Sequence, residues 1–173
     1  MTTLRRRAAA AIALVLAASI AGSGAASVPA PNGGSHPAAK DRNLREVLLV
    51  GNNWEGTADV TKPRGKFRRI ARINIIPDIQ ERMAEIATDP ERLGYFLAIR
   101  ELVGEGNDQY VDDMYTSNDG RLLIVSRPSL RDVVALDLAS GELVWRFVVD
   151  GQRSDHMAIS PDGTHVAVSA STG

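Results

Sequence analysis

The sequence predicts an all-β chain of four-stranded antiparallel sheets with a two-helix insertion. The first observation is an internal repeat: residues 112–126 match residues 155–169 at a constant offset of 43 positions, so that Asp112 corresponds to Asp155. The second is that the repeat consists of short apolar runs separated by turn residues. A period in the low forties made of short strands is the spacing of one propeller blade. We therefore expect a partial β-propeller.

The clearest blade occupies residues 107–150. Asp119-Gly120 is a strong hairpin signal because glycine adopts a positive φ without steric cost. Pro128 ends a strand, since proline has no backbone N–H to donate. We expect four strands, at residues 114–117, 122–126, 133–138 and 143–149. Residues 151–173 repeat the beginning of this pattern and are expected to start a third blade.

Residues 44–77 resemble a blade that lacks its innermost strand. Strands are expected at 47–51, 57–61 and 67–76, whereas residues 40–46 are too polar to supply one more. In a closed ring, a strand from the far C-terminus would complete such a blade.

Residues 78–106 have helical rather than strand periodicity. Asp78 followed by Glu81 is a variant of the helix capping box, and Pro90 suits the first turn of a second helix. We expect a two-helix insertion, which either covers apolar surface as a cap or closes over a binding cavity as a lid.

The N-terminal residues indicate export. Residues 1–26 contain three arginines, an apolar run from Ala8 to Ala21 and small residues up to Ala26, the pattern of a cleaved signal peptide. The apolar run is shorter than the roughly 20 residues that span a membrane, so no stable span is expected after cleavage. Both the general and the twin-arginine export routes remain open. Residues 27–43 are a proline- and glycine-rich linker, and the protein is expected to be bacterial and secreted or held in the cell envelope.

Composition excludes several classes of function. The chain has no cysteine, so cysteine-based metal, haem or nucleophile chemistry is impossible. The formal net charge of −1 gives no argument for a nucleic-acid partner. No G-x-S-x-G, H-E-x-x-H or phosphate-binding loop motif is present, and we predict neither a catalytic residue nor a metal ligand.

Candidate ligand-binding residues fall at loops that share one face of a propeller, near the mouth of its channel. Carboxylates, an imidazole and a guanidinium that converge there are the expected site. The alternative is that the acids accept hydrogen bonds from nearby backbone N–H groups and only order the loops. The candidates are Asn53, Trp54, Asp112, Asp113, Arg127, Asp155 and His156.

Residues 135–145, Ala-Leu-Asp-Leu-Ala-Ser-Gly-Glu-Leu-Val-Trp, resemble the A-x-D-x-x-T-G-x-x-x-W signature of pyrroloquinoline-quinone-type propeller repeats. The Ser-Pro-Asp-Gly turn at 160–163 is similar to that of YncE-type, or YVTN, bacterial propellers. The resemblance implies that Trp145 docks onto the adjacent blade, near the Gly turn of that blade, and that Gly141 is the glycine of such a docking turn. It also implies that a quinone or calcium ion would need the complete ring.

Two functions from different classes follow. The first is an exported β-propeller scaffold that binds a small molecule or a protein through its mouth face, without a cofactor of its own. The alternative is a fragment of a propeller enzyme, either quinone-dependent dehydrogenase-like or lactonase-like. A third reading is a gene fragment without independent function. Because the last expected hairpin has an unpaired edge, we also expect the isolated chain to self-associate.

Overall fold

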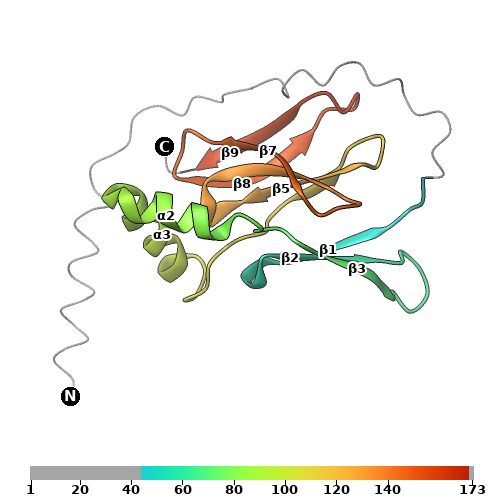
Figure 1. Cartoon of the computed structure of the whole chain (residues 1–173), viewed down its shortest axis with the longest axis horizontal. Coiled ribbons are helices and arrows are strands. Elements are labelled where there is room, and N and C mark those ends of the chain that lie inside the picture. The colour runs from blue at the N-terminus through green and yellow to red at the C-terminus, as the bar shows by residue number, and fades with distance from the viewer. Residues whose placement is uncertain (1–43, 172–173) are drawn as a thin grey trace.

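The computed structural model describes residues 44–171. The expected signal peptide, residues 1–26, and the expected linker, residues 27–43, lie outside the described residues. The described part is mostly β: three antiparallel sheets follow one another along the chain, and two α-helices lie together at one end of them (Figure 1). Neither helix is long and apolar enough to cross a membrane.

The first sheet has three strands in the order β1-β2-β3. They are Leu48–Asn52, Thr57–Thr61 and Arg69–Asn74, so the three strands expected in this region are confirmed. Residues 44–47 form no strand, and residues 40–43 lie outside the described part. The third strand is shorter than expected at both ends, and it begins later because Phe67 adopts a positive φ of 47°, which interrupts extended backbone.

The second sheet has four strands in the order β4-β5-β6-β7, as expected. They are Met114–Thr116, Leu122–Arg127, Asp132–Asp137 and Leu143–Val148. The third sheet is a hairpin of β8, Arg153–Ile159, and β9, Val166–Ser171. The pairing of β8 with β9 is irregular between Ser154 and Met157, so Asp155 and His156 lie in a bulge.

The three sheets pack face to face in chain order. Residues of β5 alternate between two apolar clusters: Leu123 and Val125 pack with Ala58 and Ile73 of the first sheet, whereas Ile124 packs with Met157 of the third (the strand is buried on both faces). Alternation of side chains along a strand explains how one apolar run serves both neighbours. The described residues form an open row of sheets rather than a closed ring.

The helices α2, Ile79–Thr88, and α3, Pro90–Leu102, form the expected insertion. Ile86 and Phe96 bury themselves against Leu130, in the connection between β5 and β6, so the helices cover apolar surface there. The Asp89 carboxylate caps α3 by accepting hydrogen bonds from the backbone N–H groups of Glu91 and Arg92.

The expected capping box at the start of α2 is wrong. The Asp78 side chain makes no capping hydrogen bond. Its two oxygens face arginines instead: Oδ1 lies 2.6 Å from Nη1 of Arg127, and Oδ2 lies 3.1 Å from Nε of Arg82. A charge-assisted contact with a guanidinium is stronger than a capping bond to a neutral N–H, which explains the difference.

Trp145 packs against other side chains, whereas Gly141 lies at an open turn. Trp145 is half-buried and packs against a cluster that includes Ile124 and Val133 of the second sheet and Met157 of the third. Gly141 has a φ of +74°, and a Cβ added there would meet no atom within 4 Å. The turn therefore needs this glycine for its backbone conformation, and docking of a neighbouring sheet at Gly141 stays a prediction.

Candidate functional site

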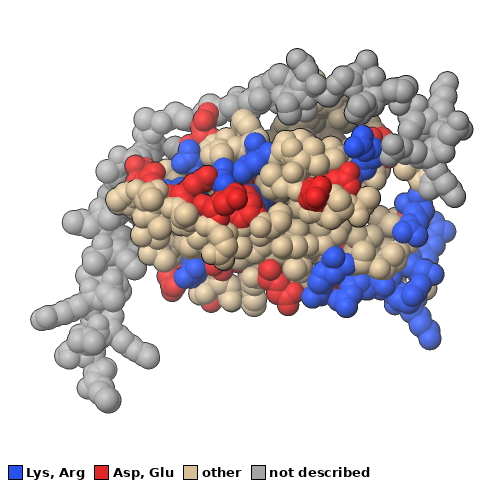
Figure 2. Space-filling model, in the orientation of Figure 1, with Lys and Arg blue, Asp and Glu red and all other residues tan. Residues whose placement is uncertain are grey.

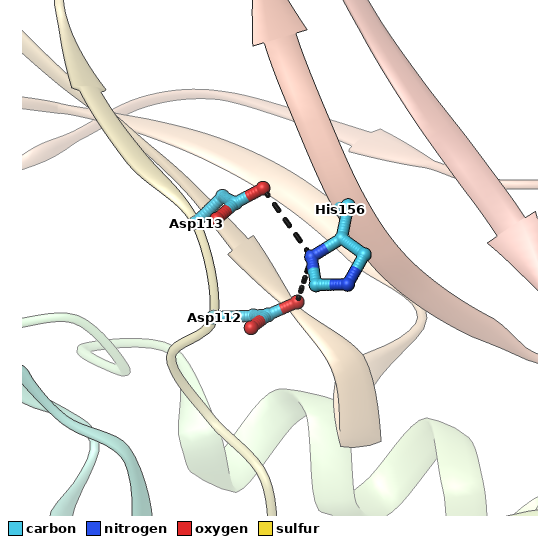
Figure 3. A group of neighbouring side chains, drawn as sticks. All are labelled: Asp112, Asp113 and His156. Carbon is cyan, nitrogen blue, oxygen red and sulfur yellow. Dashed lines mark ion pairs between the residues drawn. The ribbon is translucent and has the colours of Figure 1, made fainter.

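Three of the sequence-predicted side chains converge where β4 and β8 begin. Asp112 and Asp113 directly precede β4, and His156 lies in the bulge of β8 (Figure 3). His156 Nδ1 is 3.7 Å from Asp112 Oδ2 and 3.6 Å from Asp113 Oδ2. Both distances are too long for hydrogen bonds and suit ion pairs with a protonated imidazole.

Ser126, at the end of β5, positions the two aspartates. The Asp112 N–H donates to the Ser126 carbonyl at 3.0 Å, and the Ser126 N–H donates to the Asp113 carbonyl at 3.1 Å. The buried Ser126 hydroxyl accepts a further hydrogen bond from the Asp113 N–H at 3.2 Å. The backbone that carries both carboxylates is therefore an extension of the sheet ladder beyond β4.

The surroundings of Asp112 shift the pKa of its carboxyl group. Its pKa is raised, chiefly by burial, and then by the negative charges of Asp113 and Asp155, while His156 opposes the rise. The neighbouring carboxyl group of Asp155 adds a further, smaller rise. Asp112 Oδ2 is buried and has no hydrogen-bond partner among the described residues. The site therefore holds a carboxylate oxygen that lacks a donor.

Asp113 fits the alternative stated in the sequence analysis, in which an acid accepts a hydrogen bond from a nearby backbone N–H group and orders a loop. Its Oδ2 accepts a hydrogen bond from the backbone N–H of Met157 at 2.8 Å, which ties the second sheet to the third. The same oxygen faces His156. One carboxylate thus orders a loop and contributes to the cluster at the same time.

Asp155 lies beside the cluster rather than within it. Its Oδ2 is 2.8 Å from Nη1 of Arg153, on the same strand. It acts on Asp112 through its charge and its carboxyl contact, as described above.

The cluster has the donors for a metal ion, although the sequence predicted none. One atom each of Asp112, Asp113 and His156 lie within 4.8 Å of one another. A tetrahedral metal with bonds of about 2.0–2.2 Å separates its ligands by roughly 3.3–3.6 Å. The two separations that involve His156 Nδ1, 3.6 and 3.7 Å, are close to this range, and the two carboxylate oxygens lie within 4.8 Å of each other. The His156 side chain is 80% exposed, so its ring has room to turn toward a bound ion.

The prediction that Arg127 binds a ligand is wrong. Its side chain is completely buried, with Nε 2.7 Å from Asp132 Oδ1 and Nη1 2.6 Å from Asp78 Oδ1. Nη1 also donates to the Ile75 carbonyl at 3.1 Å. Burial acts to lower the pKa of Arg127, but hydrogen bonds to Asp132 and Asp78 outweigh it and raise the pKa. Arg127 therefore joins elements of the fold and does not face solvent.

Asn53 and Trp54 do not join the cluster either. The Asn53 side chain donates to Gln109 at 2.5 Å and accepts from the Val111 N–H at 3.0 Å, so its amide supports the segment that leads to Asp112. Trp54 is 58% exposed, in the short turn of residues 53–55 after β1. Asn53 is therefore a positioning residue, and Trp54 is a surface residue.

Comparison with known proteins does not assign the chain to a family. No protein-family model matches it, and no curated protein matches it.

Proposed function

We propose that this protein is an exported β-propeller repeat protein that binds a ligand at the face where β4 and β8 begin. The proposal rests first on the repeat: positions that correspond at an offset of 43 residues, Asp113 and His156, meet across adjacent sheets. Sheets that pack in chain order, with strands in the sequential order β4-β5-β6-β7, support the propeller part of the proposal. The signal-like residues 1–26 support export.

The ligand is cationic, and a divalent metal ion such as Zn²⁺ matches the donors best. The single observation that carries this is the convergence of two carboxylate oxygens and an imidazole nitrogen in Figure 3. Zinc accepts nitrogen and oxygen ligands in this mixture, whereas calcium prefers six or more oxygens. Burial is the main cause of the raised pKa of Asp112, and a bound cation would offset the repulsion by Asp113 and Asp155 that adds to it.

Calorimetric titration of the full chain with Zn²⁺ and with Ca²⁺, near pH 7.5, tests the proposal. We expect Zn²⁺ to bind one site, and Asp112→Asn and His156→Gln each to weaken binding at least about tenfold. Asp162→Asn is the matched control, because Asp162 is an exposed carboxylate in the turn of the β8–β9 hairpin. Binding must also weaken at acid pH, because protons compete with the metal for its nitrogen and oxygen ligands. Equal affinity in all three variants would refute the assignment.

A further inference from the structure

A small basic cleft lies between the helices and the second sheet. It has a volume of about 180 Å³ and is lined by residues of α2, α3 and β7 and of the connection between β5 and β6. Figure 2 shows basic and acidic side chains side by side in the region of α2. The charged residues of its lining are four arginines and two acids: Arg82, Arg92, Arg131, Arg146, Glu85 and Asp89. Asp112, Asp113 and His156 do not line it, so it is distinct from the site above.

Arg92 is a buried cation without an acidic partner. Arg92 is only 7% exposed. One terminal nitrogen, Nη2, donates to the Ser129 carbonyl, whereas Nη1 is buried with no hydrogen-bond partner among the described residues. The Arg92 guanidinium forms no ion pair with a described carboxylate. The nearby Asp89 side chain accepts from the Arg92 backbone N–H. A buried charge without a partner is costly, and a bound anion would relieve that cost.

The other charges of the cleft divide into paired and unpaired groups. Arg82 Nη1 and Arg146 Nη2 both contact Glu85, at 2.6 and 3.2 Å, which neutralises that carboxylate. Arg131 donates from Nε to the Val149 carbonyl at 2.9 Å and forms no ion pair with a described residue. Arg92 and Arg131 are therefore the two guanidinium groups left to attract an anion.

The electrostatics agree with an excess of positive charge. The pKa of Arg92 falls to about 10, mainly because of burial and then because of repulsion by Arg131. Asp132 and Asp89 offset part of this effect, and Arg146 adds to it.

We propose that the cleft binds a small oxyanion, specifically a phosphate group, between Arg92 and Arg131. Guanidinium groups present paired N–H donors that match the oxygens of phosphate. The volume of about 180 Å³ is several times that of a water molecule, which occupies about 30 Å³ in the liquid, so an anion of a few heavy atoms fits. The phosphate group comes either from free inorganic phosphate or from a phosphomonoester.

Thermal unfolding of the full chain, with ionic strength held constant by chloride, tests the proposal. We expect inorganic phosphate to raise the unfolding temperature in a saturable way. Arg92→Gln and Arg131→Asn should each weaken the apparent affinity at least about tenfold. Arg131→Asn is included because Arg131 has a φ of +62°, which asparagine tolerates, so this variant tests the cleft even if Arg92→Gln does not fold.

Arg64→Gln is the matched control, because the Arg64 side chain is 86% exposed. A parallel titration with glycerol 3-phosphate separates the two sources: tighter binding than inorganic phosphate indicates a phosphomonoester, and weaker binding indicates the free anion. No stabilisation beyond that of chloride would overturn the proposal. So would equal stabilisation of the wild type and Arg131→Asn.

A separate observation concerns the connection between β2 and β3. Five basic residues, four in this connection and one at the first position of β3, are all exposed: Lys62, Arg64, Lys66, Arg68 and Arg69. Phe67 stands among them, 57% exposed. Lys and Arg side chains gather at this end of the first sheet in Figure 2. Lys62, Lys66 and Arg68 form no ion pair with a described residue.

We infer that this hairpin docks on an anionic lipid surface. An aromatic side chain between cations suits the headgroup region, where the ring enters the apolar boundary and the cations meet lipid phosphates. A nucleic acid is the less favoured polyanion, because only one aromatic ring is presented for stacking.

Co-sedimentation with phosphatidylglycerol–phosphatidylcholine vesicles tests the inference. Lys66→Glu and Phe67→Ala should each reduce vesicle binding several-fold, and vesicles of phosphatidylcholine alone should not bind. Arg121→Glu, the same charge change at a side chain that is 41% exposed, is the control and should have little effect. Vesicle binding that does not depend on phosphatidylglycerol content would contradict the inference. So would a complex with double-stranded DNA that is tighter than the complex with the vesicles.

Discussion

Arg127 and Asp132 form a completely buried, two-point ion pair at the facing ends of β5 and β6. Nε lies 2.7 Å from Oδ1 and Nη2 lies 2.8 Å from Oδ2, and neither side chain is exposed. Arg146 of β7 reaches the same Asp132 carboxylate, and Asp78 reaches Arg127. The pair therefore joins three strands of the second sheet to the start of α2.

Asp132→Ala is expected to reduce the free energy of unfolding by about 3–5 kcal/mol, because it leaves the Arg127 charge buried with one fewer partner. Urea denaturation followed by circular dichroism measures this change. Glu46→Ala is the control: Glu46 pairs with Arg64 at the surface, at 3.3 Å, and its loss should cost less than about 1 kcal/mol. Equal effects of the two substitutions would show that the buried pair is not a structural link.

Trp145→Ala is expected to cost about 2–3 kcal/mol, below the 3–5 kcal/mol typical of fully buried aromatic residues, because Trp145 is half-buried. The other tryptophan offers a matched comparison. Trp54 is 58% exposed, and Trp54→Ala should change stability by less than about 0.5 kcal/mol. Thermal and urea unfolding of both variants provide the measurement. A larger loss of stability for Trp54→Ala than for Trp145→Ala would contradict the packing of Trp145 between the second and third sheets.

Asp112→Asn is expected to stabilise the protein at neutral pH in the absence of metal. The pKa of Asp112 is raised above its usual 3.8 in the folded state. Its contribution to stability is therefore fully present below pH 3.8 and is lost as the pH rises through the folded pKa. Asparagine removes both the repulsion and this pH dependence. Urea unfolding of wild type and variant across about pH 3 to 8 checks the sign, and a variant that is less stable than wild type at pH 7 would contradict it.

The free edge of β1 is expected to promote self-association. Among the described residues, β1 pairs only with β2, and Leu48 and Val50 on it are each 42% exposed. An apolar edge strand with unpaired backbone groups is a template for another strand. Val50→Lys should lower the apparent mass in light scattering, whereas Leu97→Lys, on α3, serves as a control at an exposed apolar side chain away from any sheet edge. Unchanged association in Val50→Lys would exclude this edge.

Parts of the site were predictable from the sequence because they depend on the repeat. An offset of 43 residues places Asp113 and His156 at corresponding positions of successive sheets, and sheets that pack in order bring such positions together. The Asp-Gly turns and apolar runs likewise identified the strands of the second sheet, since turn chemistry and alternation are local properties.

By itself, then, the sequence determined the strands, the helical insertion and the pairing of Asp113 with His156. Only the tertiary structure decided the fate of Arg127, whose partner Asp78 lies 49 residues away, and the existence of the cleft around Arg92. Whether a charged side chain meets solvent, a ligand or a buried carboxylate depends on which distant elements pack over it, and no local pattern records that packing.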